Sequence, residues 1–270
     1  MTESIIVVKL GGTEGVDFSA ICKDVAALVA QGQKLVLVHG GSSEANQLGE
    51  ALGRPARFIT SPSGYTSRYT DRATLEIFVM AVNGKVNSLL VEQLQKLNVN
   101  ALGLSGVDGR LLAARRKESI QSIENGKRII IRDDYTGTIE QVNVELLNLL
   151  LTNGYVPVVA PMAVSPAGES LNVDADRAAA MLAAALSASS LLLTAVPGLM
   201  RNFPDESTLI RQLPQNKLPE ALEAAQGRMK KKVLGAEEAL KGGVGRVIIA
   251  DGRIENPISN ALSGNGTVIG

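Results

Sequence analysis

The sequence predicts an α/β fold in which a mainly parallel sheet is covered by helices on both faces. Short apolar, β-branched runs alternate along the chain with longer segments of helical spacing. Glycine pairs end the first two apolar runs. Only Leu111 to Val142 departs from this alternation, with more polar and β-type residues. Because short apolar strands joined by helices are typical of parallel sheets, we expect one α/β sandwich with an inserted β-hairpin flap.

The elements follow from these patterns in order. We expect strands at 5–8, 34–38, 101–104, 156–159, 191–193 and 247–249. We expect helices at 18–30, 43–52, 71–97, 144–152, 174–185 and 229–240, with Asp71 as the N-cap of the long third helix. Within the flap, Arg128–Arg132 and Asp134–Thr138 have the composition of antiparallel hairpin strands.

Composition excludes several classes of function. Lys plus Arg and Asp plus Glu number 27 each, and a net charge of zero argues against a nucleic-acid-binding protein. Aromatic residues make up 3% with no Trp, which disfavours base-stacking platforms. The single cysteine, Cys22, and the single histidine, His39, leave no disulfide framework, Cys-rich zinc site or multi-His metal site.

The sequence shows no targeting or membrane signal. Met1–Ser4 contains no basic residue, and the apolar run Ile5–Val8 is too short for a signal peptide. No stretch approaches the roughly 20 apolar residues of a membrane span. We therefore expect a cytoplasmic protein without a membrane partner.

Two glycine pairs mark the predicted binding edge of the sheet. Gly11–Gly12 and Gly40–Gly41 follow the first two strands, and parallel sheets bind ligands outside the carboxyl ends of their strands. Glycine lets backbone N–H groups approach an anion, although a tight turn alone also explains one such pair. Two pairs favour anion binding. No P-loop, G-x-G-x-x-G or G-x-S-x-G motif is present.

Charged residues near these turns suggest the chemistry. Lys9 directs a cation at the first turn, unless it is only a solvated strand end. Lys230–Lys232 opens a helix against its macrodipole, which suggests an anionic partner, while a solvated charge run is the alternative. One of Asp174 and Asp176 can cap the Ala-rich helix and the other can orient lysines. Arg68 is a candidate clamp for a carboxylate.

Together these segments resemble the amino acid kinase family over essentially the whole chain. The segments that carry the likeness are Lys9–Gly12, His39–Gly41, Arg68 with Thr70–Asp71, Asn172–Asp176 and Gly227–Lys232. Within the family, the pattern is most similar to the kinases of 2-aminoadipate or glutamate held on an amino-group carrier protein, a sister group of the acetylglutamate kinases. Ser61–Asp71, Arg115–Glu118 and Gly227–Lys232 carry this finer likeness.

The resemblance implies a fold and a division of labour. The fold would be a three-layer αβα sandwich with an eight-stranded, mainly parallel sheet, in a single domain over 1–270. An N-terminal lobe, about 1–170, would bind the acyl acceptor, and a C-terminal lobe, about 171–270, would bind ATP. Residues 194–202 would lie near the nucleotide.

The resemblance also implies roles for single residues. Lys9 and Lys232 would stabilise the transferring phosphoryl group, with Lys230 as the alternative to Lys232, and Asp176 would hold both lysines. The backbone of Gly11, Gly12, Gly40 and Gly41 would bind phosphate and substrate, and Arg68 and Asn172 would bind the amino-acid part of the acceptor. The acceptor carboxylate is already a nucleophile at pH 7, so positioning and electrostatics suffice. Mg²⁺ would bridge the ATP phosphates with few direct protein ligands.

The flap bears on the choice of acceptor. Arg110 to Arg132 contains seven Lys or Arg and two Glu residues, a local net charge of +5. Such a patch would steer an acidic partner, and the carrier of the resembling group is a small acidic protein. We therefore expect Arg115, Arg116 and Lys117 to contact a carrier. An exposed polar hairpin without a partner is the alternative.

Other functions stay open at this point. The main one is an acetylglutamate kinase that acts on free N-acetyl-L-glutamate in arginine biosynthesis. A nucleotide-binding regulatory relative without kinase activity is another. Aminoadipate and glutamate differ by one methylene, which a pocket distinguishes weakly.

The first predicted strand leaves no N-terminal helix of the kind that assembles hexameric relatives, so we expect a homodimer. Leu75 to Leu90 would form either its interface or part of the monomer core.

Overall fold

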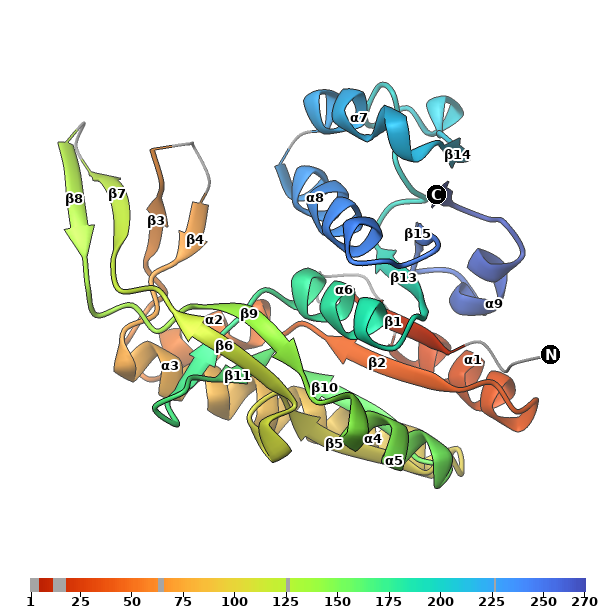
Figure 1. Cartoon of the computed structure of the whole chain (residues 1–270), viewed down its shortest axis with the longest axis horizontal. Helices are drawn as coiled ribbons and strands as arrows, with labels where there is room; N and C mark the ends of the chain where they lie inside the picture. The colour runs from red at the N-terminus through yellow and green to blue at the C-terminus, as the bar shows by residue number, and fades with distance from the viewer. Residues whose placement is uncertain (1–4, 12–17, 63–65, 125–126, 226) are drawn as a thin grey trace.

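The computed structural model describes residues 5–11, 18–62, 66–124, 127–225 and 227–270. Its centre is an eight-stranded sheet (Figure 1). Six neighbouring strands are parallel, in the order β15 (Val247–Asp251), β13 (Ser189–Thr194), β1 (Ile6–Leu10), β2 (Leu35–His39), β10 (Val156–Ala160) and β5 (Ala101–Ser105). Two short strands extend the edge: β16 (Thr267–Ile269) is antiparallel to β15, and β14 (Gln212–Leu213) is parallel to β16. The predicted mainly parallel sheet is confirmed.

Helices cover both faces of this sheet. Against one face pack α1 (Phe18–Ala30), α4 (Ser88–Lys96) and α9 (Pro257–Leu262). Against the other pack α5 (Val144–Thr152), α6 (Ala175–Ala185), α7 (Leu218–Ala224) and α8 (Gly227–Lys241). Successive side chains of a strand point to opposite faces, so Ile6 and Val8 of β1 pack in the first layer and Val7 packs in the second. The three-layer αβα sandwich is thereby confirmed.

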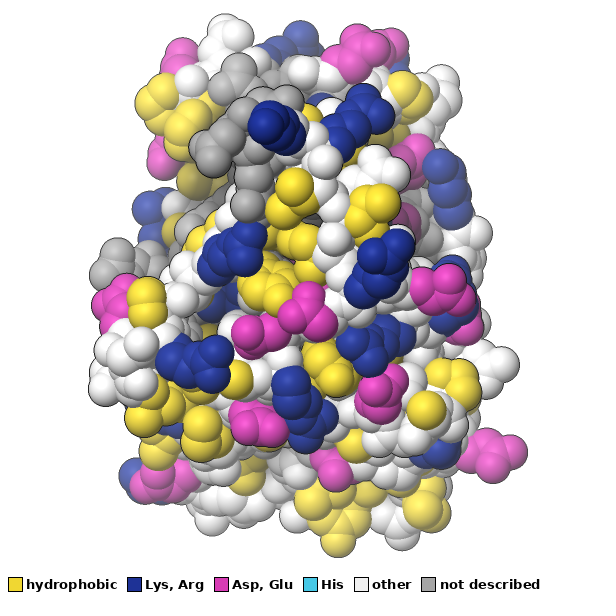
Figure 2. All heavy atoms as spheres, turned by 90° about the vertical axis from the view of Figure 1, so that its left-hand side faces the viewer, with side chains coloured by type: hydrophobic (Ala, Val, Ile, Leu, Met, Phe, Trp, Pro, Cys, Tyr) yellow, Lys and Arg dark blue, Asp and Glu magenta, His cyan; other side chains and the backbone are white. Residues whose placement is uncertain are grey.

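A second, smaller sheet and two hairpins lie beside the central sheet. The four-stranded sheet has the order β12 (Ser170–Asn172), β11 (Met162–Val164), β6 (Leu112–Arg116), β9 (Gly137–Val142). One hairpin pairs β7 (Ile120–Glu124) with β8 (Lys127–Ile131), and the other pairs β3 (Phe58–Thr60) with β4 (Thr66–Arg68). Figure 1 shows both hairpins projecting at the same end of the molecule, which faces the viewer in Figure 2.

This arrangement refines the predicted flap. Antiparallel strands do occupy the 111–142 segment, but β6 and β9 belong to the four-stranded sheet, and only β7 and β8 form the projecting hairpin. The β3–β4 hairpin was not predicted, because strands of three residues carry too little alternation to stand out.

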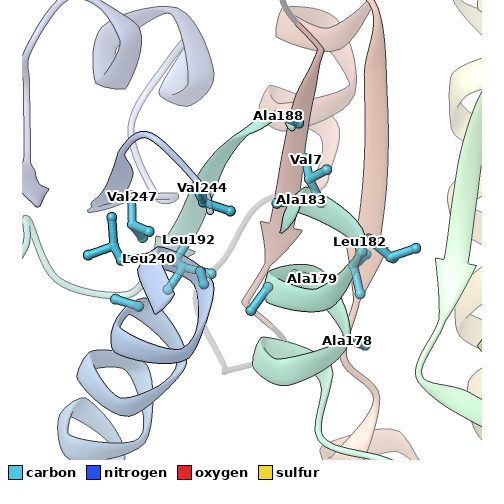
Figure 3. Close-up of a cluster of buried hydrophobic side chains, with 14 of the residues drawn as sticks. Val7, Ala178, Ala179, Leu182, Ala183, Ala188, Leu192, Leu240, Val244 and Val247 are labelled. Atoms are coloured by element: carbon cyan, nitrogen blue, oxygen red, sulfur yellow. The ribbon is translucent and has the colours of Figure 1, made fainter. Parts of the chain in front are cut away.

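The Ala-rich helix α6 sets the geometry of the binding edge. Ala178, Ala179 and Ala183 are fully buried, and Figure 3 shows alanines of α6 close to Val7 of β1. Because alanine side chains are small, the helix can lie near the strand. The first turn of α6, with Asp176, is thereby held beside the end of β1.

The long third helix is continuous from residue 72 to 96 but changes its pitch. It consists of α3 (Arg72–Val79), a π-helical segment (Met80–Asn87) and α4. Asp71 caps it by accepting a hydrogen bond from the Thr74 N–H at 2.7 Å, as predicted. By length and composition alone, this helix could cross a membrane, so the expectation that no segment is apolar enough to span one was too strict. However, 44% of its apolar 18-residue stretch is buried inside the protein, and the core helix of a soluble protein passes the same test.

Candidate active site

One cleft of about 1500 Å³ lies at the carboxyl ends of β1, β2 and β13. Its lining collects most of the predicted site residues: Lys9, Gly11, Gly40, Gly41, Arg68, Lys117, Asn172, Asp176 and Lys232. Gly12 lies outside the described residues. Among the described lining residues, six are Lys or Arg and two are Asp, so the cleft has a net charge of +4. An anionic ligand is therefore favoured, although the whole chain is neutral.

Two lysines from distant elements meet on one aspartate in this cleft. The Nζ atom of Lys9, on β1, lies 2.8 Å from Oδ1 of Asp176. The Nζ atom of Lys232, on α8, lies 3.5 Å from Oδ2 of the same carboxylate. All three side chains are largely buried. One negative charge against two positive charges leaves a surplus cation directed at the cleft.

Burial and charge shift the pKa values of this group. Burial alone would raise the pKa of Asp176, but Lys9 and Lys232 overcome it and lower the pKa to about 2. Burial, and then the nearby Lys9, lower the pKa of Lys232 to about 8, against the opposing attraction of Asp176. The carboxylate therefore stays ionised, and Lys232 is close to its titration range at neutral pH.

Two choices that the sequence left open have a geometric answer. Asp174 is the N-cap of α6, since its Oδ1 accepts hydrogen bonds from the backbone N–H groups of Asp176 and Arg177. Asp176 is then free to face the lysines. Lys232 lines the cleft, whereas Lys230 is exposed and is not among the lining residues.

The glycine turns allow close approach of the backbone at two points. A Cβ atom on Gly11 would lie 2.7 Å from the Leu193 carbonyl oxygen of β13, and one on Gly41 would lie 2.7 Å from a Val82 methyl group. Gly41 is also the N-cap of α2 (Ser42–Ala51) and offers no side chain as a cap. The first-turn N–H groups of α2 are thus left at the cleft, where a helix N-terminus favours anions.

The single histidine supports the second glycine turn. Nδ1 of His39 lies 2.7 Å from the Gly40 carbonyl oxygen, which can only accept, so Nδ1 carries the proton. Nε2 then accepts from the Asn87 amide at 2.9 Å. Burial lowers the pKa of His39 to about 4, against the Gly40 hydrogen bond. The ring is therefore neutral and holds the backbone rather than a ligand.

Arg68 is a buried cation without a carboxylate partner in the described part of the chain. Its guanidinium lies 5.3 Å and 5.9 Å from the ring centres of Phe58 and Phe78, and one N–H donates to the Ser42 carbonyl at 3.1 Å. Burial lowers its pKa. Because an unpaired buried charge is costly, this geometry favours a carboxylate ligand in the cleft.

Hydrogen bonds tie Asn172 to the Arg68 segment. The Asn172 amide nitrogen donates to the Thr70 hydroxyl at 3.2 Å, and that hydroxyl donates to the Arg68 carbonyl at 3.3 Å. The buried Asp134 carboxylate accepts from the Thr70 backbone N–H at 3.0 Å. Sequence reasoning assigned no role to Thr70 or Asp134. Thr70 stood only in a segment that carries the family resemblance, and Asp134 only in a stretch of the flap with hairpin composition.

The flap cations are less free than the local net charge suggested. Arg115 pairs with Glu140 at 2.7 Å and Arg116 with Glu169 at 2.9 Å, both acids lying outside the 110–132 segment. Arg116 also lies 3.7 Å from the ring centre of Tyr135. In Figure 2, Lys and Arg side chains are interspersed with Asp and Glu around a hydrophobic area. Acids outside the segment therefore offset part of its +5 net charge, and of the three predicted carrier contacts only Lys117 lines the cleft.

Metal-ligating side chains do not cluster in the described part of the chain. No three His, Cys, Asp or Glu side chains come together there to hold a metal ion. Both oxygens of Asp176 already face lysines.

Comparison with known proteins identifies the family. The sequence model of the amino acid kinase family matches residues 4–251. The chain belongs to the amino acid kinase family. ATP is accordingly the expected phosphoryl donor of this kinase fold.

Near-full-length relatives have specific names. The LysW-aminoadipate kinase of Deinococcus radiodurans is 58% identical over 98% of this chain and 91% of its own length. The LysW-aminoadipate kinase of Thermus thermophilus is 55% identical over 98% of this chain and 100% of its own. A LysW-aminoadipate/LysW-glutamate kinase from Sulfolobus acidocaldarius is 37% identical over 98% of this chain and 100% of its own length.

Solved structures agree on the fold. N-acetylglutamate synthase from Neisseria gonorrhoeae, in complex with coenzyme A and N-acetyl-glutamate, superposes with a TM-score of 0.79 at 27% identity, over 99% of this chain and 59% of that one. Carbamate kinase from Giardia lamblia bound to AMP-PNP superposes with a TM-score of 0.68 at 16% identity, over 99% of this chain and 98% of that one. The second likeness concerns the fold alone.

Proposed function

We propose that this kinase transfers the γ-phosphoryl group of ATP to the side-chain carboxylate of 2-aminoadipate attached to an acidic amino-group carrier protein, as a step of lysine biosynthesis. Carrier-bound glutamate is proposed as a second acceptor. The observation that carries the proposal is one cationic cleft that contains both the Lys9–Asp176–Lys232 group and the buried Arg68, which has no carboxylate partner among the described residues. The names and near-full-length similarity of the relatives support the choice of acceptor.

The lysine group suits the phosphoryl-transfer step. The acceptor carboxylate attacks the γ-phosphorus, the bond to the ADP leaving group breaks, and no general base is needed because the carboxylate is ionised at pH 7. Lys9 and Lys232 would neutralise charge on the phosphoryl oxygens. Asp176 holds both ammonium groups in place before the substrates arrive, so little reorganisation is needed. Mg²⁺, held through the ATP phosphates, would supply further neutralisation.

Arg68 and Asn172 suit the acceptor. Arg68 can bind a carboxylate through guanidinium N–H groups that its Ser42 contact does not use. Asn172 lines the cleft beside it, with amide hydrogen-bonding capacity left over from its contact with Thr70. The backbone at Gly40 and Gly41 would complete the site. These contacts would hold the reacting carboxylate in line with the phosphoryl group.

We propose that the carrier approaches along the flap side of the cleft, which Lys117 lines together with Ile120 and Gln121 of β7. We also propose a homodimer in the cytoplasm. Most large apolar residues of 75–90 are buried in the monomer, which leaves exposed Met80 and Leu89 as apolar contacts on the long helix. Light scattering in solution would measure the oligomeric state.

An acyl-phosphate assay with hydroxylamine trapping tests the proposed function. Carrier-linked aminoadipate, carrier-linked glutamate and free N-acetylglutamate would be offered separately with ATP. We expect turnover on the carrier-linked acceptors, with the free acid at least about tenfold slower in kcat/KM. Efficient turnover of the free acid alone would instead identify an acetylglutamate kinase. Absence of hydroxamate with every acceptor would contradict a carboxyl kinase.

A further inference from the structure

The Thr70 side chain is a buried polar group that lies behind the acceptor residues. Thr70 has no exposed surface, and it is not among the residues that line the cleft, unlike Arg68 and Asn172. Its hydroxyl is used in both directions: it donates to the Arg68 carbonyl at 3.3 Å and accepts from the Asn172 amide at 3.2 Å. It therefore joins two substrate-binding candidates that lie 104 residues apart in the sequence.

This hydroxyl also determines which end of the Asn172 amide faces it. A threonine hydroxyl has one proton, and the Arg68 carbonyl can only accept, so that proton is committed. The atom of Asn172 that faces Thr70 must then be the donor, the amide nitrogen. The carbonyl oxygen of the amide and the second N–H are left for a ligand. Without the hydroxyl, this contact would no longer distinguish the two orientations.

Asp134 anchors the same loop from the flap side. Its carboxylate is 1% exposed, and its oxygens accept from the backbone N–H of Thr70 at 3.0 Å and from the N–H and hydroxyl of Thr136. The adjacent Tyr135 donates its N–H to the Thr70 carbonyl at 2.7 Å and accepts from the Asn172 N–H at 2.8 Å. Arg116 braces this segment by donating to the Asp134 carbonyl at 3.0 Å.

We propose that Thr70 and Asp134 are positioning residues for the acceptor: they orient the Asn172 amide and the Arg68 segment without touching substrate. The inference rests on the proposed function, since it concerns the same acceptor site. It also links the flap to that site, because the 134–135 segment lies in the connection between β8 and β9. The lysine group contacts none of these atoms, so nucleotide binding should be independent of them.

The decisive comparison is Thr70→Val against Thr70→Ser. Valine keeps the shape but removes both hydroxyl hydrogen bonds, whereas serine keeps the hydroxyl. We expect Thr70→Val to raise the acceptor KM about tenfold and to change the ATP KM less than about twofold. The acceptor KM of Thr70→Ser should stay within about threefold of the wild-type value. Equal effects of valine and serine, or equal increases in both KM values, would overturn the proposal.

Two further measurements keep the test independent of folding and of acceptor identity. Asp134→Asn, which places an amide N–H against a backbone N–H, should show the same split between acceptor KM and ATP KM if Thr70→Val does not fold. In an Asn172→Ala background, Thr70→Val should add less than about threefold to the acceptor KM, and a full additional tenfold would contradict action through Asn172. Wild-type turnover of free N-acetylglutamate alone would contradict the proposed acceptor, and the variants would then be compared on that acid.

Discussion

The two ends of the cleft are built in different ways. The lysine group is made from regular elements, with Lys9 on a central strand, Asp176 in the first turn of α6 and Lys232 on α8. The acceptor end is made from a short hairpin, loops and a three-residue strand that carry Arg68, Thr70 and Asn172. Ion pairs organise the first group, and hydrogen bonds, several of them to the Asp134 carboxylate, organise the second.

This difference suggests a division between chemistry and recognition. A rigid strand and two packed helices hold charges where small displacements would be costly for phosphoryl transfer. Loops and hairpins can vary in sequence without disturbing the central sheet, so they are suited to distinguish acceptors. The two regions should therefore respond differently to substitution, the first through kcat and the second through the acceptor KM.

The largest effect should come from Lys232→Met. Removal of one fixed cation from the transferring group should lower kcat about 100- to 1000-fold, with a smaller change in acceptor KM. The matched control is Lys230→Met, because Lys230 is in the same helix but is exposed and does not line the cleft. The kcat of this variant should stay within about twofold of the wild-type value. The hydroxamate assay measures both. Equal losses in the two variants would refute the assignment of Lys232.

Arg68→Ala should act at the other end. The acceptor KM should rise about 10- to 100-fold, because a charged hydrogen bond to the acceptor is lost, while the ATP KM should change little. Initial rates with each substrate varied in turn measure the two constants. The clamp role is wrong if both constants rise by the same factor. Lys96→Ala is a control, since that exposed side chain pairs with Glu92 on the surface of α4, and neither residue lines the cleft.

The pH dependence should distinguish the two ends as well. The pKa of Lys232 is lowered to about 8, so its charge is lost as the pH rises through 8 rather than above 10. We expect kcat/KM for ATP to fall towards tenfold per pH unit above that value, whereas it should be flat from pH 6.5 to 7.5. Lys232→Arg should move the decline to higher pH. A wild-type profile that stays flat to pH 9.5 would contradict a required Lys232 charge.

The smallest effect should come from the flap. Lys117→Ser should raise the KM for a carrier-linked acceptor about threefold at low salt, and the difference should vanish at high salt because exposed charges are screened. Arg115→Ser is the comparison, since Arg115 is already paired with Glu140 outside the cleft. If Arg115→Ser raised this KM more than Lys117→Ser, or raised it equally at low and high salt, the carrier would contact the surface around Arg115 rather than the cleft margin.

Periodicity explains how much of the fold was predictable. The 18–30 and 144–152 helices have the predicted bounds, and each of the six predicted strands is present with its ends shifted by at most a few residues. Local burial repeats with the period of the element, so these elements are visible in one sequence. The β3–β4 hairpin, β14, β16, α7 and α9 lacked such a signal, because they are short or lie at the edge of the sheet.

By itself the sequence determined the αβα order of elements, the glycine turns at the ends of β1 and β2, and the set of cations that could serve phosphoryl transfer. Only the tertiary structure decided that Lys232 rather than Lys230 lines the cleft, that Asp174 caps while Asp176 pairs, and that Thr70 joins Asn172. The physical reason is the difference in sequence separation between local burial patterns and tertiary contacts. Burial patterns repeat every two to four residues along the chain, whereas the Thr70 contacts with Asp134 and Asn172 span 64 and 102 residues and exist only once the strands have paired.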